Sequence, residues 1–320
     1  MARLAQLFRS ASFVRRAVAG TAVVGTGLAA SQGRDLLREW RSRHAGLLSP
    51  CKGPTDGIEQ GRPAGADSRR RRGAGTAPGA AEAGRRPTLV LFLGDSLVCG
   101  VGGQAGSAPL PAALPQAVAA RLSDLKGSAV RWASVGIVGA GVDRLVAEGL
   151  PLLRGKIASC HDTTHVVVVV VVGVNDLKQM NFAGYRLGLR RLVAEVRVLV
   201  SELRDVARRG QVVDVFVPEL KIADAPLLQR FPLRFFARPV CALWEREKRQ
   251  AVGPDNQAEV LAFPQPPEGV DVATLFSKDE MHPSLSGYEW WADNLARQIH
   301  SRLGARVAWG PLAGQPRSEA

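Results

Sequence analysis

The sequence is poor in cysteine, and this shortage excludes a class of protein. Only four cysteines are spread through 320 residues, and no two of them form a Cys-x-x-Cys pair. A dense disulfide framework, as in small secreted domains, is therefore excluded. Cys160 and His161 come shortly before His165, but no further cluster of acids or histidines completes a set of three or four metal ligands. We expect neither a metal nor a cofactor.

The N-terminal part of the chain lacks acidic residues before Asp35. Residues 1–33 carry four arginines and a small-residue apolar stretch from Ala17 to Ala30. That stretch is too short for a typical membrane span but suits the core of a signal peptide, whereas the acid-free, arginine-containing composition equally suits an organellar presequence. We expect a targeting segment here, and import into mitochondria or another organelle, secretion and membrane anchoring remain open.

Acidic charge is scarce through residue 86 but not beyond it. The chain has a net charge of +13; residues 1–86 hold 16 basic and 6 acidic residues, and the remaining residues hold 26 and 23. Four consecutive arginines, residues 69–72, stand in a Gly/Ala/Pro-rich stretch without aromatic residues. This composition favours a largely disordered linker over residues 34–86, with a possible short helix at 35–44. We expect no nucleic-acid partner, while peripheral membrane contact through the basic leader remains open.

Beyond residue 86, strand and helix signals alternate without an internal repeat. This alternation predicts an α/β domain over residues 87–305, with a parallel sheet, right-handed crossovers and helices on both faces, followed by a tail at 306–320. The expected strands are residues 88–94, 129–136, 166–172 and 212–218; the expected helices are residues 112–126, 141–154, 184–209, 241–252 and 285–303; and residues 219–240 are expected to be irregular.

A run of seven valines is followed by the polar pair Asn175 and Asp176. Because valine favours extended backbone and this run has no polar alternation, it predicts a strand covered on both faces. Ligands in such sheets lie beyond the carboxyl ends of the strands, where this pair falls. The alternative is an ordinary turn, since Gly, Asn and Asp all favour turns.

Ser96 stands two residues after Gly94, at the same predicted edge of the sheet. A helix beginning there would direct free N–H groups at an attacking serine oxygen, although an N-cap serine gives the same pattern. A serine nucleophile needs a base and an acid that orients it. His282 comes just before the last helix, with Asp279 three residues earlier. No Gly-x-Ser-x-Gly occurs, which argues against the usual α/β-hydrolase pattern.

Together, these motifs resemble those of the SGNH, or GDSL, hydrolases over roughly residues 87–303. The matching segments are Gly94-Asp95-Ser96-Leu97, Gly139, Gly173-Val174-Asn175-Asp176 and Asp279-Glu280-Met281-His282. The second block departs from the family pattern, because Ser134 stands where many members have Asn, and Gly136 and Gly141 are alternative matches for its glycine.

The resemblance implies a three-layer α/β/α sandwich with about five parallel strands in flavodoxin-like order. It implies that Ser96 is the nucleophile, His282 the base and Asp279 the acid that orients the base. The backbone N–H groups of Ser96 and Gly139 and the side-chain amide of Asn175 would form the oxyanion hole. Four further residues would support the site: Gly94, Asp95, Gly173 and Asp176.

The expected function is therefore that of a serine esterase or lipase-like hydrolase acting on a small-molecule or lipid ester. An acyltransferase of the same fold and a non-catalytic binding member are the alternatives. A dinucleotide-binding motif at Gly139-Ala140-Gly141 is disfavoured because Arg144 occupies the third glycine position. Residues 225–240, rich in phenylalanine, leucine and arginine, are interpreted either as a lid or wall for an acyl chain or as a loop whose aromatics enter the core. The oligomeric state is left open.

Overall fold

The computed structural model describes residues 53–60, 87–103, 113–158, 165–177, 182–206, 212–253 and 258–308, with six single residues between 35 and 50. The predicted targeting segment, most of the predicted linker and residues 309–320 lie outside the described residues. Within the described part, no helix is both long enough and apolar enough to cross a membrane.

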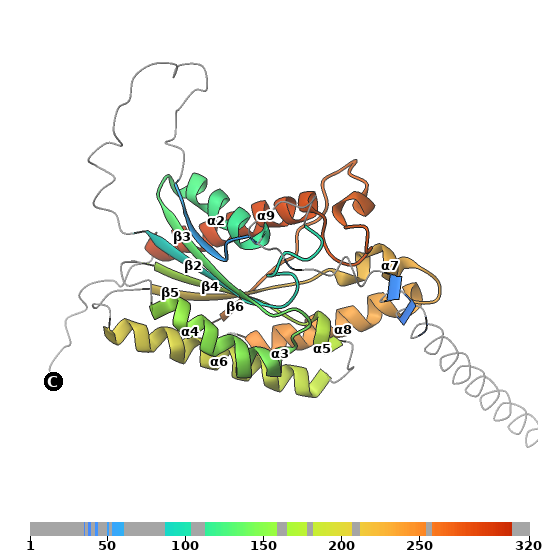
Figure 1. The fold of residues 1–320 in the computed structure, drawn as a ribbon, viewed down its shortest axis with the longest axis horizontal. Coiled ribbons are helices and arrows are strands. Elements are labelled where there is room, and N and C mark those ends of the chain that lie inside the picture. The colour runs from blue at the N-terminus through green and yellow to red at the C-terminus, as the bar shows by residue number, and fades with distance from the viewer. Residues whose placement is uncertain are drawn as a thin grey trace, which may run out of the picture.

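A six-stranded sheet forms the centre of the molecule (Figure 1). Its order is β1-β3-β2-β4-β5-β6, and every neighbouring pair is parallel except β1 with β3. The five parallel strands follow the flavodoxin-like order, so the predicted fold class is confirmed. The strand bounds are β1 (Asp56–Glu59), β2 (Thr88–Gly94), β3 (Val130–Gly136), β4 (His165–Val171), β5 (Val212–Pro218) and β6 (Ala258–Leu261).

Two strands were not expected from the sequence. β1 lies inside the segment interpreted as linker, so that interpretation fails for these four residues. Its sequence, DGIE, contains a single large apolar side chain, and this edge strand is held by backbone pairing to β3. β6 is equally short. Periodicity cannot reveal strands of this length, because their placement depends on a partner strand.

Helices cover both faces of the sheet and complete the three layers (Figure 1). The helices α2 (Ala113–Lys126) and α9 (Leu285–Ala308) pack on one face. The opposite face carries α3 (Val142–Arg144), the π-helical turn η2 (Leu145–Gly149), α4 (Leu150–Ala158), α6 (Phe182–Val206) and α8 (Arg234–Val252).

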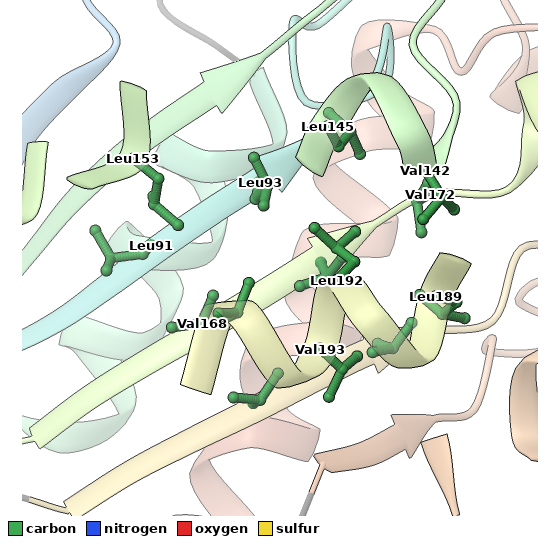
Figure 2. Close-up of a cluster of buried hydrophobic side chains, with 14 of the residues drawn as sticks. Leu91, Leu93, Val142, Leu145, Leu153, Val168, Val172, Leu189, Leu192 and Val193 are labelled. Atoms are coloured by element: carbon green, nitrogen blue, oxygen red, sulfur yellow. The ribbon is translucent and has the colours of Figure 1, made fainter. Parts of the chain in front are cut away.

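The valine run is β4, between β2 and β5 in the sheet. Its side chains alternate between two cores: Val168 and Val170 pack with the α6 side, and Val167 and Val169 pack with the α2 and α9 side. Figure 2 shows Val168 and Val172 in the buried cluster that also contains Leu192 of α6. Both faces are therefore dry, and each fully buried valine stabilises the fold by about 1.5–3 kcal/mol.

The segment 219–240 was expected to be irregular, and the structure corrects this. It contains the 3-10 turn η3 (Ile222–Asp224), the short helix α7 (Pro226–Gln229) and the first turns of α8. α8 begins well before the expected residue 241, because Pro239 lies inside the helix without ending it. The buried side chains of Ala237, Cys241 and Trp244 hold this helix against the core.

Candidate active site

The loop after β2 places Ser96 at the carboxyl edge of the sheet. Gly94 ends the strand, and a Cβ atom there would lie 2.3 Å from the carbonyl oxygen of Val171 on β4, so this close approach requires glycine. The helix considered at this position is not formed, because consecutive turns follow Ser96 and the Val101 N–H donates to the Ser96 carbonyl oxygen at 3.0 Å. Ser96 is buried to 7% exposure.

Asp95 connects this loop to the one after β4. Its carboxylate is fully buried and accepts a hydrogen bond from the Leu97 N–H through Oδ1 at 3.0 Å. Its Oδ2 atom accepts a second from Asn175 Nδ2 at 3.0 Å. The two bonds join the serine loop to the end of the valine strand.

Asn175 is held firmly beside Asp95. Gly173 precedes it with a φ of +130°, a conformation suited to glycine, and a Cβ atom there would lie 2.9 Å from Tyr185 Oη. Besides Asp95, Asn175 Nδ2 donates to the Ala140 carbonyl oxygen at 3.0 Å. Both partners accept hydrogen bonds only, so the amide NH₂ must face them. Asn175 lies in the short helix α5 (Val174–Leu177). It therefore joins three segments of the chain and is no simple turn residue.

Asp176 and Gly139 belong to the same junction. Both carboxylate oxygens of Asp176 accept from the Val142 N–H, at 3.0 and 3.2 Å, and so brace the start of α3. Burial raises the pKa of Asp176, an effect that the Val142 N–H opposes. Gly139 lies in an exposed turn with a φ of +74°, directly before the Ala140 carbonyl that Asn175 contacts.

A tight loop before α9 carries Asp279 and His282. Its ends are joined where the Ser277 N–H donates to the His282 carbonyl oxygen at 2.8 Å. Asp279 is fully buried and accepts three hydrogen bonds through Oδ1: from the N–H groups of Met281 and His282, both at 2.9 Å, and from Ser277 Oγ at 2.7 Å. Its Oδ2 atom lies 2.6 Å from His282 Nδ1.

These contacts set the charge of Asp279. Burial alone would raise its pKa, but the hydrogen bond and charge of His282, together with the backbone N–H groups of His282 and Met281, outweigh burial and lower the pKa to about 2. The carboxylate is therefore ionised at neutral pH. It favours the imidazole tautomer with a proton on Nδ1, which leaves Nε2 as an acceptor.

Ser96 meets that second ring nitrogen. Ser96 Oγ lies 3.0 Å from His282 Nε2, within hydrogen-bonding distance. The structure thus brings Ser96, His282 and Asp279 into one chain of hydrogen bonds, although Ser96 is 186 positions from His282 in the sequence. A hydroxyl, a base and an orienting carboxylate in this order can generate a nucleophile.

An apolar pocket opens beside Ser96 and His282. Its walls come from the segments after β4, β5 and β6, from η5 (Val272–Leu275) and from α9. The charged residues in its lining are Lys221 and Asp224. The apolar lining consists of Leu97, Val174, Leu220, Ile222, Phe263, Pro266, Val272, Leu275, Phe276, Met281, Pro283, Trp290 and Trp291.

Residues 225–240 do not line this pocket, contrary to the interpretation as an acyl-chain wall. The alternative also fails for the phenylalanines, because Phe231, Phe235 and Phe236 are exposed at 68%, 58% and 36%. Among the leucines and phenylalanines of this segment, Leu227 alone is almost fully buried.

Sequence reasoning missed several residues that shape the site. Ser277 hydrogen bonds to Asp279, and its position two residues before an aspartate was an available turn signal. Tyr288 of α9 donates to the Val101 carbonyl oxygen at 2.8 Å and ties the serine loop to that helix, which no local pattern indicates. Glu280 has a φ of +60° and pairs with Arg230.

The histidines considered for a metal site lie elsewhere. His165 Nε2 is 2.7 Å from Asp214 Oδ2, at the amino end of β4 and so at the opposite edge of the sheet from Ser96. Within the described part of the chain, no group of three or more His, Cys, Asp or Glu residues is arranged to hold a metal. Cys160 and His161 lie outside the described residues.

Comparison with curated protein sequences finds no match. Solved structures that resemble the fold include the lipase Lip_vut3 from a goat rumen metagenome, with 18% identity, a TM-score of 0.45 and coverage of 67% of this chain and 97% of that one. A family 3 carbohydrate esterase of Clostridium thermocellum has 16% identity, a TM-score of 0.46 and coverage of 68% and 98%. Est24, a carbohydrate acetylesterase from Sinorhizobium meliloti, has 18% identity, a TM-score of 0.41 and coverage of 67% and 99%.

A family model gives the firmer result. The model of the GDSL-like lipase/acylhydrolase family matches residues 92–290, well over half of the chain. The match extends from the serine loop, through the Asn175 junction, to the loop that carries His282. The chain therefore belongs to the GDSL-like lipase/acylhydrolase family, and it is a carboxylic ester hydrolase.

Proposed function

We propose that the protein cleaves esters through an acyl-enzyme on Ser96. One observation carries the proposal: Ser96 Oγ, His282 and the buried Asp279 carboxylate form a continuous hydrogen-bonded chain, with distances of 3.0 and 2.6 Å, beside an apolar pocket. This arrangement supplies a nucleophile, a base on its hydroxyl and an anion to stabilise the protonated base.

In the first half-reaction, Ser96 Oγ attacks the ester carbonyl carbon while its proton moves to His282 Nε2. The tetrahedral intermediate collapses, the carbon–oxygen bond to the alcohol breaks, and Nε2 returns the proton to the departing alcohol oxygen. In the second half-reaction, water attacks the acyl carbon and gives a proton to Nε2. The bond to Ser96 then breaks, Oγ recovers the proton, and the carboxylic acid departs.

The negative charge that develops on the carbonyl oxygen needs donors fixed in advance. We assign this role to the backbone N–H groups of Ser96 and Gly139 and to the Asn175 amide. Both N–H bonds of Asn175 have protein acceptors in the resting site, Asp95 and Ala140. Asn175 therefore donates to the oxyanion by sharing one of these hydrogen atoms between its resting acceptor and the substrate oxygen. The two resting hydrogen bonds hold the amide in position.

The pocket supports an ester with an apolar group. Its lining is almost entirely aliphatic and aromatic, and it begins at Ser96 and His282. Transfer of a hydrocarbon chain from water into such a pocket lowers the free energy of the system, whereas a sugar would lose hydrogen bonds to water there. We assign the pocket to the acyl chain of the substrate.

The nucleophile is tested with a fluorophosphonate probe, which forms a covalent bond with an activated serine. The wild-type protein should be labelled and should hydrolyse p-nitrophenyl esters, whereas Ser96→Ala should do neither and should retain its melting temperature. Ser123→Ala is the matched control, because Ser123 is also buried and its hydroxyl bonds to the carbonyl oxygens of Glu59 and Ser128, away from the site. Labelling that persists in Ser96→Ala contradicts the assignment.

The pocket is tested with p-nitrophenyl esters of increasing acyl length. Val272 lines the pocket, whereas Val270 is 38% exposed and lies outside its lining. Val272→Phe should narrow the pocket and lower kcat/KM for long chains while sparing the acetate, and Val270→Phe should change neither. Equal loss for acetate and long chains in Val272→Phe, or none at all, would remove the pocket from the acyl-binding role.

A further inference from the structure

A cluster of apolar side chains is exposed near the site on the turn after α7 and on the first half of α8. It contains Phe231, Phe235, Phe236 and Leu243, with exposed fractions of 68%, 58%, 36% and 49%. Phe231 and Phe235 lie edge to face, with ring centroids 6.0 Å apart. Leu243 follows the two helical phenylalanines by seven and eight residues and so lies on the same helix face. Aromatic side chains this exposed indicate an interaction surface.

The same stretch is basic. Residues 226–243 contain three arginines and no acidic residue. Arg230 pairs with Glu280, while Arg234 and Arg238 are exposed and form no ion pair with any residue that the structure describes. Arg234 lies over the ring of Phe235, 4.9 Å from its centroid. We call Phe231, Phe235, Phe236 and Leu243, with Arg234 and Arg238, the α7–α8 surface.

The chemistry of this surface selects one partner. Exposed aromatics suit the boundary between headgroups and acyl chains, and unpaired arginines suit anionic headgroups. The stretch contains no acidic residue that would repel anionic headgroups. We propose that the α7–α8 surface docks the enzyme on an anionic phospholipid bilayer.

Docking here would bring the lipid close to the loop that carries His282. The Leu227 N–H donates to the Glu280 carbonyl oxygen at 3.2 Å, and Arg230 pairs with the Glu280 side chain. Glu280 lies between Asp279 and His282, and Met281 beside it lines the apolar pocket. The bilayer would thus lie beside the site, although vesicle binding itself does not depend on the ester chemistry.

The experiment measures co-sedimentation of the full chain with vesicles of phosphatidylcholine alone and of phosphatidylcholine mixed with phosphatidylserine. Wild-type protein should bind the mixed vesicles more strongly, and added salt should weaken this binding. Arg234→Gln with Arg238→Gln should weaken binding to the mixed vesicles on the order of tenfold. Phe231→Ser with Phe235→Ser and Phe236→Ser should weaken it at least about tenfold, since the buried apolar area is lost.

The matched control replaces three equally exposed apolar residues away from this surface, Leu152, Leu187 and Val198, by serine. This variant should bind as the wild type does, and all variants should hydrolyse soluble p-nitrophenyl acetate at the wild-type rate. If both surface variants still bind vesicles, the membrane-binding site would lie in the basic residues 1–86, and the proposal would be overturned. Absence of binding to anionic vesicles, or loss of a dimer by light scattering in the phenylalanine variant alone, would also overturn it.

Discussion

Two histidine–aspartate pairs lie at opposite edges of the same sheet. His282 Nδ1 is 2.6 Å from Asp279 Oδ2 beyond the carboxyl ends of the strands, and His165 Nε2 is 2.7 Å from Asp214 Oδ2 at their amino ends. Both aspartate side chains are completely buried. By distance and burial alone, the two pairs are nearly equivalent.

The difference lies in the other nitrogen of each ring. His282 presents Nε2 to Ser96 Oγ at 3.0 Å and lines the apolar pocket. His165 uses Nε2 for the aspartate, and its ring contacts no serine hydroxyl among the described residues. His165 also does not line the pocket beside Ser96. A buried histidine–aspartate bond is therefore a structural feature by default, and it becomes chemically useful only where the second nitrogen meets a nucleophile.

The largest expected contrast between the two pairs is in catalysis. His282→Ala should lower kcat for p-nitrophenyl esters on the order of 10⁶, the size seen when the base of a serine hydrolase is removed. His165→Ala should keep kcat within a few-fold but lower the free energy of unfolding by up to about 3 kcal/mol, because the buried Asp214 carboxylate would lose its bond to the imidazole. Steady-state kinetics measure kcat, and urea denaturation measures the free energy of unfolding. Equal losses of kcat in the two variants would contradict the distinction between the two histidine–aspartate pairs.

The aspartates should show a smaller contrast of the same kind. Asp279→Asn should reduce kcat on the order of 10⁴, since the amide no longer favours the imidazole tautomer with Nε2 as acceptor. Asp214→Asn should leave kcat nearly unchanged. If Asp214→Asn slowed turnover as strongly as Asp279→Asn at the same melting temperature, the pair at the amino ends would have to communicate with the site.

Asn175, just beyond the carboxyl end of the strand that begins with His165, should have an intermediate effect. Asn175→Ala should lower kcat by about 10²–10³ with little change in KM, the usual result of losing one oxyanion donor. Asn175→Asp should be worse in both activity and stability, because a carboxylate would replace the amide that lies 3.0 Å from the Asp95 carboxylate.

The stability of each variant separates the two roles of Asn175. Melting temperature should fall more in Asn175→Asp than in Asn175→Ala, since the alanine introduces no second charge beside Asp95. A variant Asn175→Asp that retains both wild-type kcat and wild-type melting temperature would exclude the oxyanion role.

The smallest effect expected is on acid stability. The pKa of Asp279 is lowered to about 2 in the folded protein, against about 3.9 in an unfolded chain. Its contribution is therefore complete above pH 4 and is lost as the pH falls toward 2. Asp279→Asn should be less stable at neutral pH by about 2 kcal/mol and should lose this part of the acid dependence. Urea denaturation between pH 2 and 6 measures the free energy of unfolding of the wild type and of Asp279→Asn. The same pH dependence in both proteins would contradict the prediction.

Much of the fold was predictable from local pattern. β2, β5 and the valine strand β4 were found almost to the residue, because long apolar β-branched runs bounded by glycine or proline have few other solutions. β1 and β6 were not predictable, since four-residue strands are stabilised by a neighbouring strand. The early start of α8 was hidden by Pro239.

The sequence by itself determined the identities and edge of the site: Ser96 and Asn175 follow parallel strands, and Asp279 stands three residues before His282. Only the tertiary structure decided that His282 Nε2 comes within 3.0 Å of Ser96 Oγ, because contact across 186 positions of chain depends on how the sheet and α9 pack. It also decided that Asn175 bonds to Asp95 and Ala140, and that the phenylalanines of α7 and α8 face outward. Local pattern specifies backbone conformation and burial tendency, whereas the direction of a polar contact depends on loops that meet only after the core has formed.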